Sequence, residues 1–462
     1  MTHRNHPLDS LKSLFSEQTW TGGAAGGTVN IASSRNIPVE NSGELMMNGV
    51  LDPLRASVTG AALACAVMLP ASGAEAKGVH ILYTFTGGSD GGVPYDSLYV
   101  DQSGNFYGTT YQGGTGTACS GGCGTVFKLT PDGMETVLYS FQGGSDGAYP
   151  MAAVIADGKG NLYGVTEGAD TVTDFGTVFR IAPDGTETVL HAFCSSRNCK
   201  DGAYPQGGLV FDQQGDLYGT TTEGGSKTCS GGCGTVFRVT SKGRESVVYS
   251  FQGGSDGSAP TATLFPDGKG NFFGTTFQGG VHQRCLGGCG TVFELTAGGT
   301  ESVIYAFKAG HDGCSPLGNV ITDKNGNIYG TTYYGGGGGK CDAGCGTVFK
   351  VASGGGETVL HAFTGHKPDG CDVAAGVIAD KTGTLYGTTA YGGTKSCYCG
   401  IVFKLDPDGT ETVLHAFPFS GGNIDGAYVP FGGVIADGRK LYGTTDGANG
   451  RLGYGVVYRL DK

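Results

Sequence analysis

Aspartate followed by glycine recurs along the chain, and a set of such carboxylates could bind cations or accept hydrogen bonds from sugar hydroxyls. The alternative is structural: each carboxylate accepts N–H groups of its own turn while the glycine takes a positive φ. Because a single site rarely needs an equivalent group in every copy of a repeat, the structural interpretation is favoured. The aspartates are Asp90, Asp146, Asp201, Asp256, Asp312, Asp369 and Asp425.

Aromatic side chains offer a second kind of binding chemistry, because a sugar ring can stack on an aromatic face. The only tryptophan is Trp20, near the start of the chain, so tyrosine would have to serve in a mature protein. Packing within the loops is the favoured alternative for each. The candidates in or beside variable loops are Tyr111, Tyr333, Tyr334 and Tyr391.

Histidine could transfer protons, but its placement argues against that role here. His191, His361 and His415 stand in "LHAF" at a position that other copies fill with tyrosine. Exchange between histidine and tyrosine predicts a packed ring with a polar tip. Other catalytic signatures, such as G-x-S-x-G, H-E-x-x-H or a Walker loop, do not occur. The sequence therefore predicts no catalysis and no cofactor.

Fifteen cysteines could form disulfides or hold zinc. Local disulfides are favoured, because each C-x-x-x-C loop supplies two thiolates where structural zinc takes four ligands, and successive loops are far apart. No metal site is therefore expected. Cys314, Cys371, Cys397 and Cys399 cannot be paired from the sequence. The expected disulfides are Cys119–Cys123, Cys194–Cys199, Cys229–Cys233, Cys285–Cys289 and Cys341–Cys345.

These residues are carried by a tandem repeat. An aromatic-Gly-x-Thr motif begins at Tyr107, Tyr163, Tyr218, Phe273, Tyr329, Tyr386 and Tyr442, so successive copies are 56, 55, 55, 56, 57 and 56 residues apart by subtraction. Each copy has four short runs rich in β-branched and aromatic residues, separated by Gly, Asp, Asn and Pro turns. Four antiparallel strands per copy and seven copies predict an all-β protein, a seven-bladed β-propeller.

The two ends of the repeat predict how the ring closes. The last copy ends at "GVVYRLDK" without its fourth strand, and a run of the missing type, "VHILYTF", precedes the first copy. We expect residues 80–85 to pair with Val456–Leu460 and complete the last blade, which leaves no exposed edge. The glycine inside each second strand, for example Gly108, is expected to let a neighbouring backbone come close.

Strand order predicts which loops share a face. With strands A to D counted from the axis outward, the B–C loops and the D–A connections emerge on one face, and the tight turns emerge on the other. Variable loops on a rigid scaffold often carry function, so the face with the B–C and D–A loops is the candidate binding surface.

Residues 1–76 do not belong to the repeat. Residues 46–76 resemble a secretory signal, with an apolar run in Ala56–Ala76 and small residues at Ala74 and Ala76. Residues 1–45 are then a disordered extension or precede the true start, and residues 79–462 form the propeller. An uncleaved membrane anchor is the alternative for the apolar run. The formal net charge of −12 argues against nucleic acid and anionic membranes as partners.

The string from Asp201 to Thr240, with "ETVLHAF" at Glu187–Phe193, resembles the GloVer-type tandem repeats of secreted bacterial proteins, and "HAF" is similar to the HAF extracellular repeats. The resemblance covers about Val79 to Lys462. It implies an extracellular or periplasmic protein and brings no catalytic residues.

Sequence and resemblance together predict a secreted, monomeric binding scaffold. Its ligand is an extracellular molecule, a glycan or a protein. The alternative is an extracellular carbohydrate-active enzyme, a polysaccharide lyase or glycosidase with an axial active site.

Overall fold

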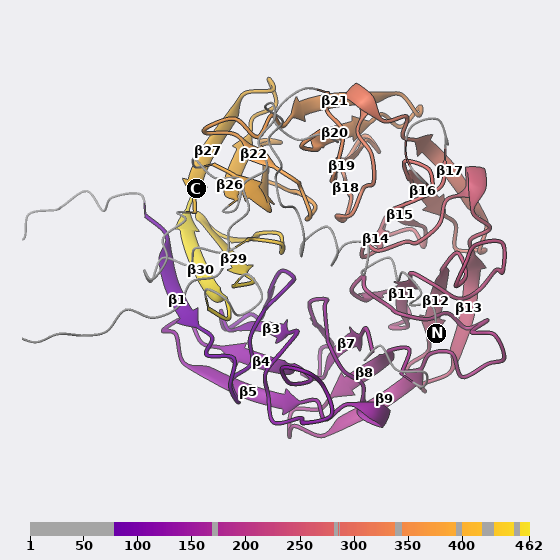
Figure 1. The fold of residues 1–462 in the computed structure, drawn as a ribbon, viewed down its shortest axis with the longest axis vertical. Helices are drawn as coiled ribbons and strands as arrows, with labels where there is room; N and C mark the ends of the chain where they lie inside the picture. The colour runs from indigo at the N-terminus through magenta and orange to yellow at the C-terminus, as the bar shows by residue number, and fades with distance from the viewer. Residues whose placement is uncertain are drawn as a thin grey trace, which may run out of the picture. The chain divides into compact units, whose positions relative to one another are not determined.

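The computed structural model describes residues 78–168, 174–280, 285, 287–337, 344–393, 400–417, 429–447 and 453–462. The predictions for residues 1–76 therefore lie outside the described residues. From residue 78 onward, seven four-stranded antiparallel sheets follow one another around a ring (Figure 1). This confirms the seven-bladed β-propeller.

The first four blades have the same strand pattern. Blade 1 contains β2 (Tyr99–Val100), β3 (Phe106–Thr110), β4 (Thr125–Leu129) and β5 (Glu135–Ser140). Blade 2 contains β6 (Ile155–Ala156), β7 (Leu162–Thr166), β8 (Thr177–Ile181) and β9 (Glu187–Ala192). Blade 3 contains β10 (Val210–Phe211), β11 (Leu217–Thr221), β12 (Thr235–Val239) and β13 (Glu245–Ser250). Blade 4 contains β14 (Phe265–Pro266), β15 (Phe272–Thr276), β16 (Thr291–Leu295) and β17 (Glu301–Ala306).

The remaining blades complete the ring. Blade 5 contains β18 (Ile321–Thr322), β19 (Ile328–Thr332), β20 (Thr347–Val351) and β21 (Glu357–Ala362). Blade 6 contains β23 (Ile378–Ala379), β24 (Leu385–Thr389), β26 (Ile401–Leu405) and β27 (Glu411–Ala416), with a small ribbon of β22 (Gly370–Cys371) and β25 (Tyr391–Gly392) beside it. Blade 7 contains β28 (Ile435–Asp437), β29 (Lys440–Thr445), β30 (Val456–Asp461) and β1 (His80–Thr84). Three single 3-10 turns are the only helices in the described part of the chain: η1 (Gly144–Asp146), η2 (Gly254–Asp256) and η3 (Gly310–Asp312).

Blade 7 combines strands from both ends of the repeat region, as predicted. β1 is the outer strand of this sheet and pairs antiparallel with β30, with Ile81 opposite Tyr458 and Thr84 opposite Val456. The ring is therefore closed by backbone hydrogen bonds between segments more than 370 residues apart, since 456 − 84 = 372.

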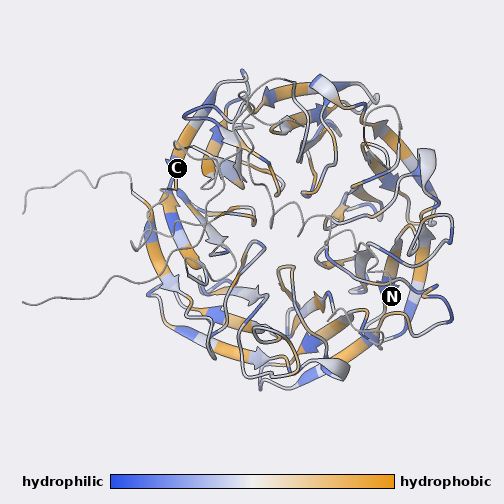
Figure 2. Cartoon of the chain, in the orientation of Figure 1, coloured by the Kyte–Doolittle hydropathy of each residue, from blue (hydrophilic) through white to orange (hydrophobic). Residues whose placement is uncertain are grey.

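The hydrophobic core lies between the blades. Hydrophobic stretches alternate with hydrophilic ones along the strands (Figure 2), and buried side chains form one cluster at each of the seven blade boundaries. A phenylalanine just after each outer strand packs edge-on against an aromatic ring in the third strand of the next blade, with centroids 4.9–5.2 Å apart. Each blade thus buries its apolar face against its neighbour.

The same aromatic ring explains the glycine inside each second strand. A Cβ at Gly108 would lie 2.6 Å from Cζ of Phe127, its cross-strand partner, and the equivalent distance at the other six glycines is 2.5–2.7 Å. The expected reason, the approach of a neighbouring backbone, is wrong: an aromatic side chain of the adjacent strand occupies the space.

Within the part of the chain that the structure describes, no helix has the length and apolar character needed to cross a membrane.

Candidate functional site

The loops on the predicted binding face interlock. Residues of a D–A connection form antiparallel bridges with the B–C loop of the following blade, as at Gly92 with Gln112 and Ser258 with Gln278. Further bridges join Ala203 to Glu223 and Cys314 to Tyr334. The two kinds of loop therefore lie together.

The Asp-Gly aspartates are held within their own turns. Six of the seven are described, and Asp425 lies outside the described residues. Each of the six accepts a hydrogen bond from a backbone N–H four to six residues earlier, which fixes the turn after the outer strand. The donors are Thr86 for Asp90 (2.8 Å), Gln142 for Asp146 (2.9 Å), Ser195 for Asp201 (3.0 Å), Gln252 for Asp256 (2.5 Å), Lys308 for Asp312 (2.5 Å) and Thr364 for Asp369 (2.8 Å).

The same aspartates explain why histidine and tyrosine exchange in the outer strand. The hydroxyl of Tyr139 donates to Asp146 at 3.0 Å, while His191 Nε2 lies 3.2 Å from Asp201. Burial and the hydrogen bond to the carboxylate raise the pKa of Tyr139 well above its usual value. The other described pairs are Tyr83–Asp90, Tyr249–Asp256, Tyr305–Asp312 and His361–Asp369. Ligand binding by these aspartates stays a prediction.

A glutamate at the start of the following outer strand faces each of these turns. Burial, together with the charge of Asp256, raises the pKa of Glu301 to about 8. Burial and the neighbouring aspartate raise the pKa to about 7 at Glu135, Glu187, Glu245 and Glu357. Burial also raises the pKa of Glu411. We call the repeated unit of aspartate, tyrosine or histidine, and next-blade glutamate the rim unit.

Three of the four candidate tyrosines lie near one another, and Tyr111 lies apart from them: the pKa of Tyr333 is raised by burial, by the charge of Asp372 and by the neighbouring Tyr391 and Tyr334. Tyr111 is 8% exposed and Tyr333 is 2% exposed, so both are largely packed. The ring of Tyr334 lies edge-on to that of Tyr333 with centroids 4.6 Å apart, and Tyr391 belongs to β25 in the next blade. Only Tyr111 joins the cluster described next. A binding role for the other three stays a prediction.

Aromatic residues from three consecutive blade regions meet around Tyr95. The ring of Tyr95 packs against Tyr111 at 5.3 Å and against Phe431 at 5.6 Å, while Tyr111 stacks on Tyr149 at 4.6 Å. We call Tyr95, Tyr111, Tyr149 and Phe431 the inner cluster. The neighbouring residue Asp96 links the short inner strands: its carboxylate accepts the N–H of Ala153, and its carbonyl accepts the hydroxyl of Thr444. The inner cluster therefore lies on the inner side of blades 7, 1 and 2.

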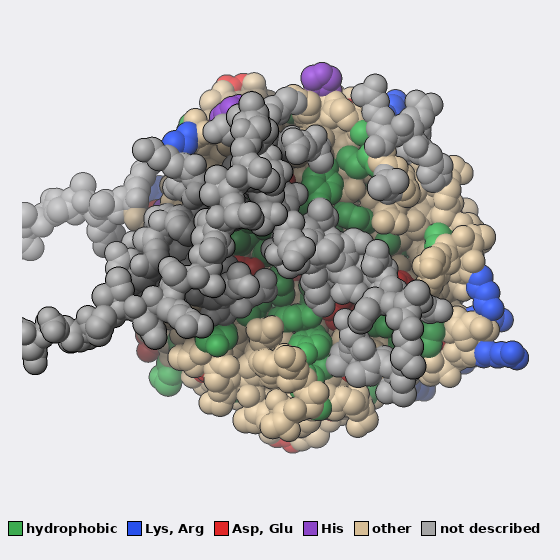
Figure 3. Space-filling view, in the orientation of Figure 1, with side chains coloured by type: hydrophobic (Ala, Val, Ile, Leu, Met, Phe, Trp, Pro, Cys, Tyr) green, Lys and Arg blue, Asp and Glu red, His purple; other side chains and the backbone are tan. Residues whose placement is uncertain are grey.

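Two buried carboxylates accompany the inner cluster. Glu167 is 4% exposed and Asp446 is 3% exposed. Burial raises the pKa of Tyr95, and the charges of Asp446 and Glu167 raise it further. Gln206 donates to Glu167 through Nε2 at 3.3 Å. On the face drawn in Figure 3, hydrophobic and acidic side chains are visible inside the ring.

Tyr95, Tyr111, Phe431 and the two carboxylates occupy two positions of the repeat that differ from blade to blade, whereas Tyr149 stands at a third position, in the D–A connection. None of the fourteen residues at those two positions is Lys, Arg or His, so the site combines aromatic rings with acceptor groups. The position after the second strand carries Tyr111, Glu167, Thr222, Phe277, Tyr333, Ala390 and Asp446. The position four residues before the start of the inner strand carries Tyr95, Met151, Gln206, Thr261, Leu317, Ala374 and Phe431.

Sequence reasoning named Tyr111 but missed the other members of this site. Tyr95, Phe431, Glu167 and Asp446 stand where the copies disagree, outside both the repeated aspartates and the tyrosines of the variable loops. The available signal was the change of residue type directly after the repeated "GTT" and after the proline of the D–A connection.

A recess of about 370 Å³ on the described surface lies elsewhere, at the outer loops of blade 1. Six of its eight lining residues are glycine, and Gln112 and Tyr454 provide the side chains. It offers few groups that could fix the orientation of a ligand.

The cysteine loops follow the prediction where they are described. Disulfides join Cys119 to Cys123, Cys194 to Cys199, Cys229 to Cys233 and Cys285 to Cys289. Cys341, Cys397 and Cys399 lie outside the described residues, so the predicted Cys341–Cys345 bond does too.

Comparison with known families gives one match. The Gloeobacter/Verrucomicrobia repeat matches residues 71–231 and 226–458, which together span nearly all of the described chain. No curated protein sequence matches.

Two solved structures resemble this chain at low sequence identity. PorZ, a surface component of the type-IX secretion system of Porphyromonas gingivalis, is 15% identical with a TM-score of 0.49, over 79% of this chain and 46% of PorZ. A puromycin-hydrolyzing peptidase of Mycobacterium tuberculosis is 13% identical with a TM-score of 0.46, over 82% of this chain and 54% of the peptidase. This chain thus spans about half the length of either protein. Since both TM-scores are below 0.5, these likenesses say nothing about what this chain binds or does.

Proposed function

The chain belongs to the Gloeobacter/Verrucomicrobia repeat family, and we propose that it is an exported, non-catalytic binding protein that holds a carbohydrate at the inner cluster. The observation that carries this proposal is the meeting of four aromatic rings with two buried carboxylates. Five of these six groups, all but Tyr149, stand at repeat positions that carry no Lys, Arg or His in any blade.

This combination matches the chemistry of a sugar. Aromatic faces pack against the C–H surface of a pyranose ring, and carboxylates accept hydrogen bonds from its hydroxyl groups. A mostly apolar surface with a few convergent polar groups is also the usual composition of a small-molecule site. An anionic polysaccharide is disfavoured, because Glu167 and Asp446 would repel it and no Lys or Arg stands at these positions.

Export is supported by the cysteines. Four disulfides within short loops fit an oxidising compartment, because cytosolic proteins rarely keep structural disulfides. The apolar segment Ala56–Ala76 would then act as a cleaved signal peptide. N-terminal sequencing of protein from the native host tests this, and a mature protein that retains this segment contradicts it.

The binding proposal is tested by affinity measurements on neutral, amino and acidic polysaccharides, each assayed in parallel for turnover. We expect binding to a neutral or amino sugar polymer without product formation. Phe431→Leu and Asp446→Asn should weaken binding at least about tenfold, the effect of losing roughly 1.4 kcal/mol. Asp146→Asn, a matched change in a rim unit, should leave affinity unchanged. Absence of binding to every polymer, or equal affinity of all three variants, contradicts the proposal.

An enzyme is the second candidate, and one observation favours it. Glu167 and Asp446 are two buried carboxylates whose charges act on one tyrosine, and glycosidases use a carboxylate pair with separated pKa values. Product formation that is abolished by both Glu167→Gln and Asp446→Asn would establish the enzyme and overturn the non-catalytic role.

A further inference from the structure

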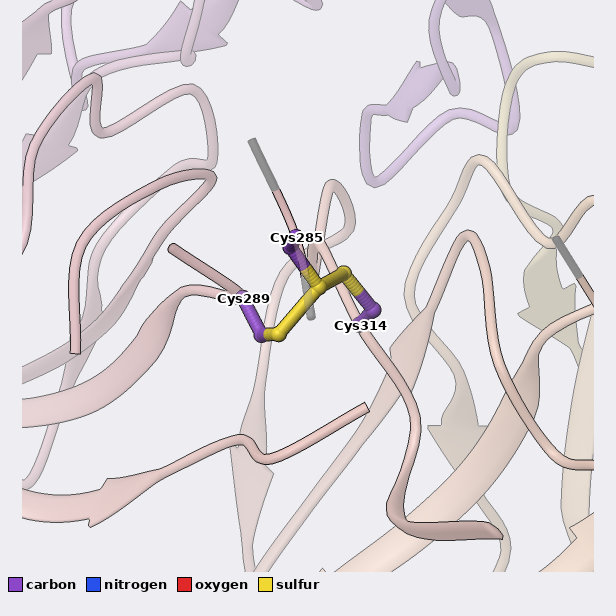
Figure 4. A group of neighbouring side chains, drawn as sticks. All are labelled: Cys285, Cys289 and Cys314. Carbon is purple, nitrogen blue, oxygen red and sulfur yellow. A yellow bond between two sulfur atoms is a disulfide. The ribbon is translucent and has the colours of Figure 1, made fainter. Parts of the chain in front are cut away.

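A third cysteine joins one of the disulfide loops. The Sγ atoms of Cys285, Cys289 and Cys314 all lie within 4.8 Å of one another. Cys285 lies between the other two and contacts both sulfurs (Figure 4). Because a sulfur forms only one disulfide bond at a time, one of these three cysteines is a thiol whenever the other two are oxidised.

Two equivalent loops of the same chain lack the third cysteine and can be compared with this one. After each loop, the backbone N–H of one residue donates to the carbonyl of the second cysteine: Ala259 to Cys233 at 2.9 Å and Ser315 to Cys289 at 2.8 Å. The residue preceding that donor is Ser258 in one case and Cys314 in the other, so the two positions are equivalent. The loop of Cys119 and Cys123 has Ala148 at this position, since Tyr149 donates to Cys123 at 2.9 Å.

The equivalent backbones show which pair is bonded at rest. The Cα atoms of Cys285 and Cys289 are 5.3 Å apart, close to the 5.1 Å of Cys229 and Cys233. The Cα atoms of Cys285 and Cys314 are 7.5 Å apart, beyond the usual limit of about 6.8 Å. Cys285–Cys289 is therefore the resting disulfide, and a bond from Cys285 to Cys314 requires a small backbone movement.

We propose that Cys285, Cys289 and Cys314 form a thiol–disulfide exchange site. The thiolate of Cys314 attacks Cys285 Sγ, the Cys285–Cys314 bond forms, and the Cys285–Cys289 bond breaks. The electron pair of the broken bond goes to Cys289 Sγ, which takes up from solvent a proton equivalent to the one that Cys314 released. The step is an isomerisation, so it consumes no oxidant or reductant.

The three cysteines differ in their exposure to solvent. Cys289 is 0% exposed and Cys314 is 6% exposed, whereas Cys285 is partly exposed. The free thiol is thus shielded in either isomer, and the sulfur shared by both bonds is the accessible one.

A neighbouring blade also has a cysteine at the third position. Asp372 donates its N–H to the carbonyl of Cys345 at 2.8 Å, which places Cys371 in the position of Cys314. Its Sγ lies 2.7 Å from Cys345 Sγ. The third cysteine is therefore present in two successive blades.

Three thiolates could instead hold a soft metal ion. The backbone geometry favours exchange. The equivalent loops, which have alanine or serine at the third position, form disulfides with nearly the same Cα separation as Cys285 and Cys289. Metal binding is an outcome that the test below distinguishes.

The test uses the full chain purified without reductant, quenched in acid, alkylated in denaturant and digested without reduction for peptide mapping. Exchange predicts two populations: a Cys285–Cys289 link with label on Cys314, and a Cys285–Cys314 link with label on Cys289. Cys314→Ser, which copies the loop of Ser258, should abolish the label on Cys289, and Cys289→Ser should give the Cys285–Cys314 link. The pair Cys229 and Cys233 should stay unlabelled throughout.

Several results would overturn the proposal. Label confined to Cys314, or two free thiols in Cys289→Ser, means that no exchange occurs. Label on all three cysteines, or a metal ion retained in native mass spectrometry and lost in Cys314→Ser, means that the thiols are reduced or ligated. Circular dichroism melting of each variant checks folding, and Cys314→Ala, which copies Ala148, replaces any serine variant that fails to fold.

Discussion

The rim unit and the inner cluster differ in one respect: the rim unit recurs with the same residue types in blade after blade, whereas the combination of residues in the inner cluster does not recur in another described blade. At the rim, Asp146 and Asp256 have nearly the same partners, a tyrosine hydroxyl and a backbone N–H. At the inner cluster, Tyr95 and Phe431 stand at one repeat position that holds a different residue in each blade. A residue that recurs in every blade meets a structural requirement that all blades share. A position whose residue differs from blade to blade is where one blade can bind a ligand that the others do not bind.

The largest effect is expected in the repeated core. Phe237 is 0% exposed and packs against Phe193 with centroids 4.9 Å apart. Phe237→Ala should lower the free energy of unfolding by about 3–5 kcal/mol, because it leaves a cavity between blades 2 and 3. Urea denaturation measures this. Val247→Ala, at the cross-strand partner of Phe237 and on the exposed side, should change stability by less than about 0.5 kcal/mol.

The second-largest loss of stability is expected when a rim unit is changed. Asp256→Ala leaves the N–H of Gln252 without its acceptor and the hydroxyl of Tyr249 with only the 3.5 Å contact to Glu301 Oε2, so we expect a loss of about 1–3 kcal/mol. Tyr249→Phe removes only one of these bonds and should cost about 0.5–1.5 kcal/mol. If neither variant changes the urea midpoint, the turn role of the repeated aspartates is wrong.

The rim units also predict how stability depends on pH. Burial and a facing aspartate raise the pKa of Glu301 to about 8 and of four other glutamates to about 7. The folded state therefore holds more protons than the unfolded state between the ordinary glutamate pKa and these values, so stability should fall as pH rises from about 5 to 8.

Melting temperature as a function of pH measures this fall. Glu301→Gln cannot ionise and should flatten the curve. Burial lowers the pKa of His191. This shift has the opposite effect on the curve, because it lowers the stability of the fold as pH falls. A wild-type curve that rises from pH 5 to pH 8 would contradict the glutamate contribution.

The smallest effect on stability is expected at the inner cluster. Phe431 is partly exposed, and Phe431→Leu keeps most of its apolar volume, so the loss should be below about 1.5 kcal/mol. If this variant destabilises the fold as strongly as Phe237→Ala, the inner cluster is part of the hydrophobic core and serves packing alone.

Much of the rim could be inferred from the sequence because its contacts are local. Asp146 bonds to residues four and seven positions earlier, so composition and spacing along one copy were enough to favour a turn. The inner cluster could not be inferred in the same way. Tyr95 and Phe431 are 336 residues apart by subtraction, and only the closed ring brings them to 5.6 Å.

Some predictions had the right position and the wrong cause. The sequence predicts that a neighbouring backbone comes close at Gly108, but the group that occupies the space is the ring of Phe127 on the paired strand. The direction in which a side chain points across a sheet depends on register, and register is not visible in one copy of the repeat.

The sequence alone determined the number of blades, the strand order within each blade and the closure by residues at the two ends of the repeat, because the period and the missing strand fix them. It also determined the short disulfide loops, since their partners are four or five residues apart. Only the tertiary structure decided that Cys314 joins Cys285 and Cys289, that the rim glutamates face aspartates of the preceding blade, and that aromatic rings and carboxylates meet at one place. The physical reason is that each of these contacts crosses from one sheet, or one loop, to another, and its distance is set by how the sheets pack.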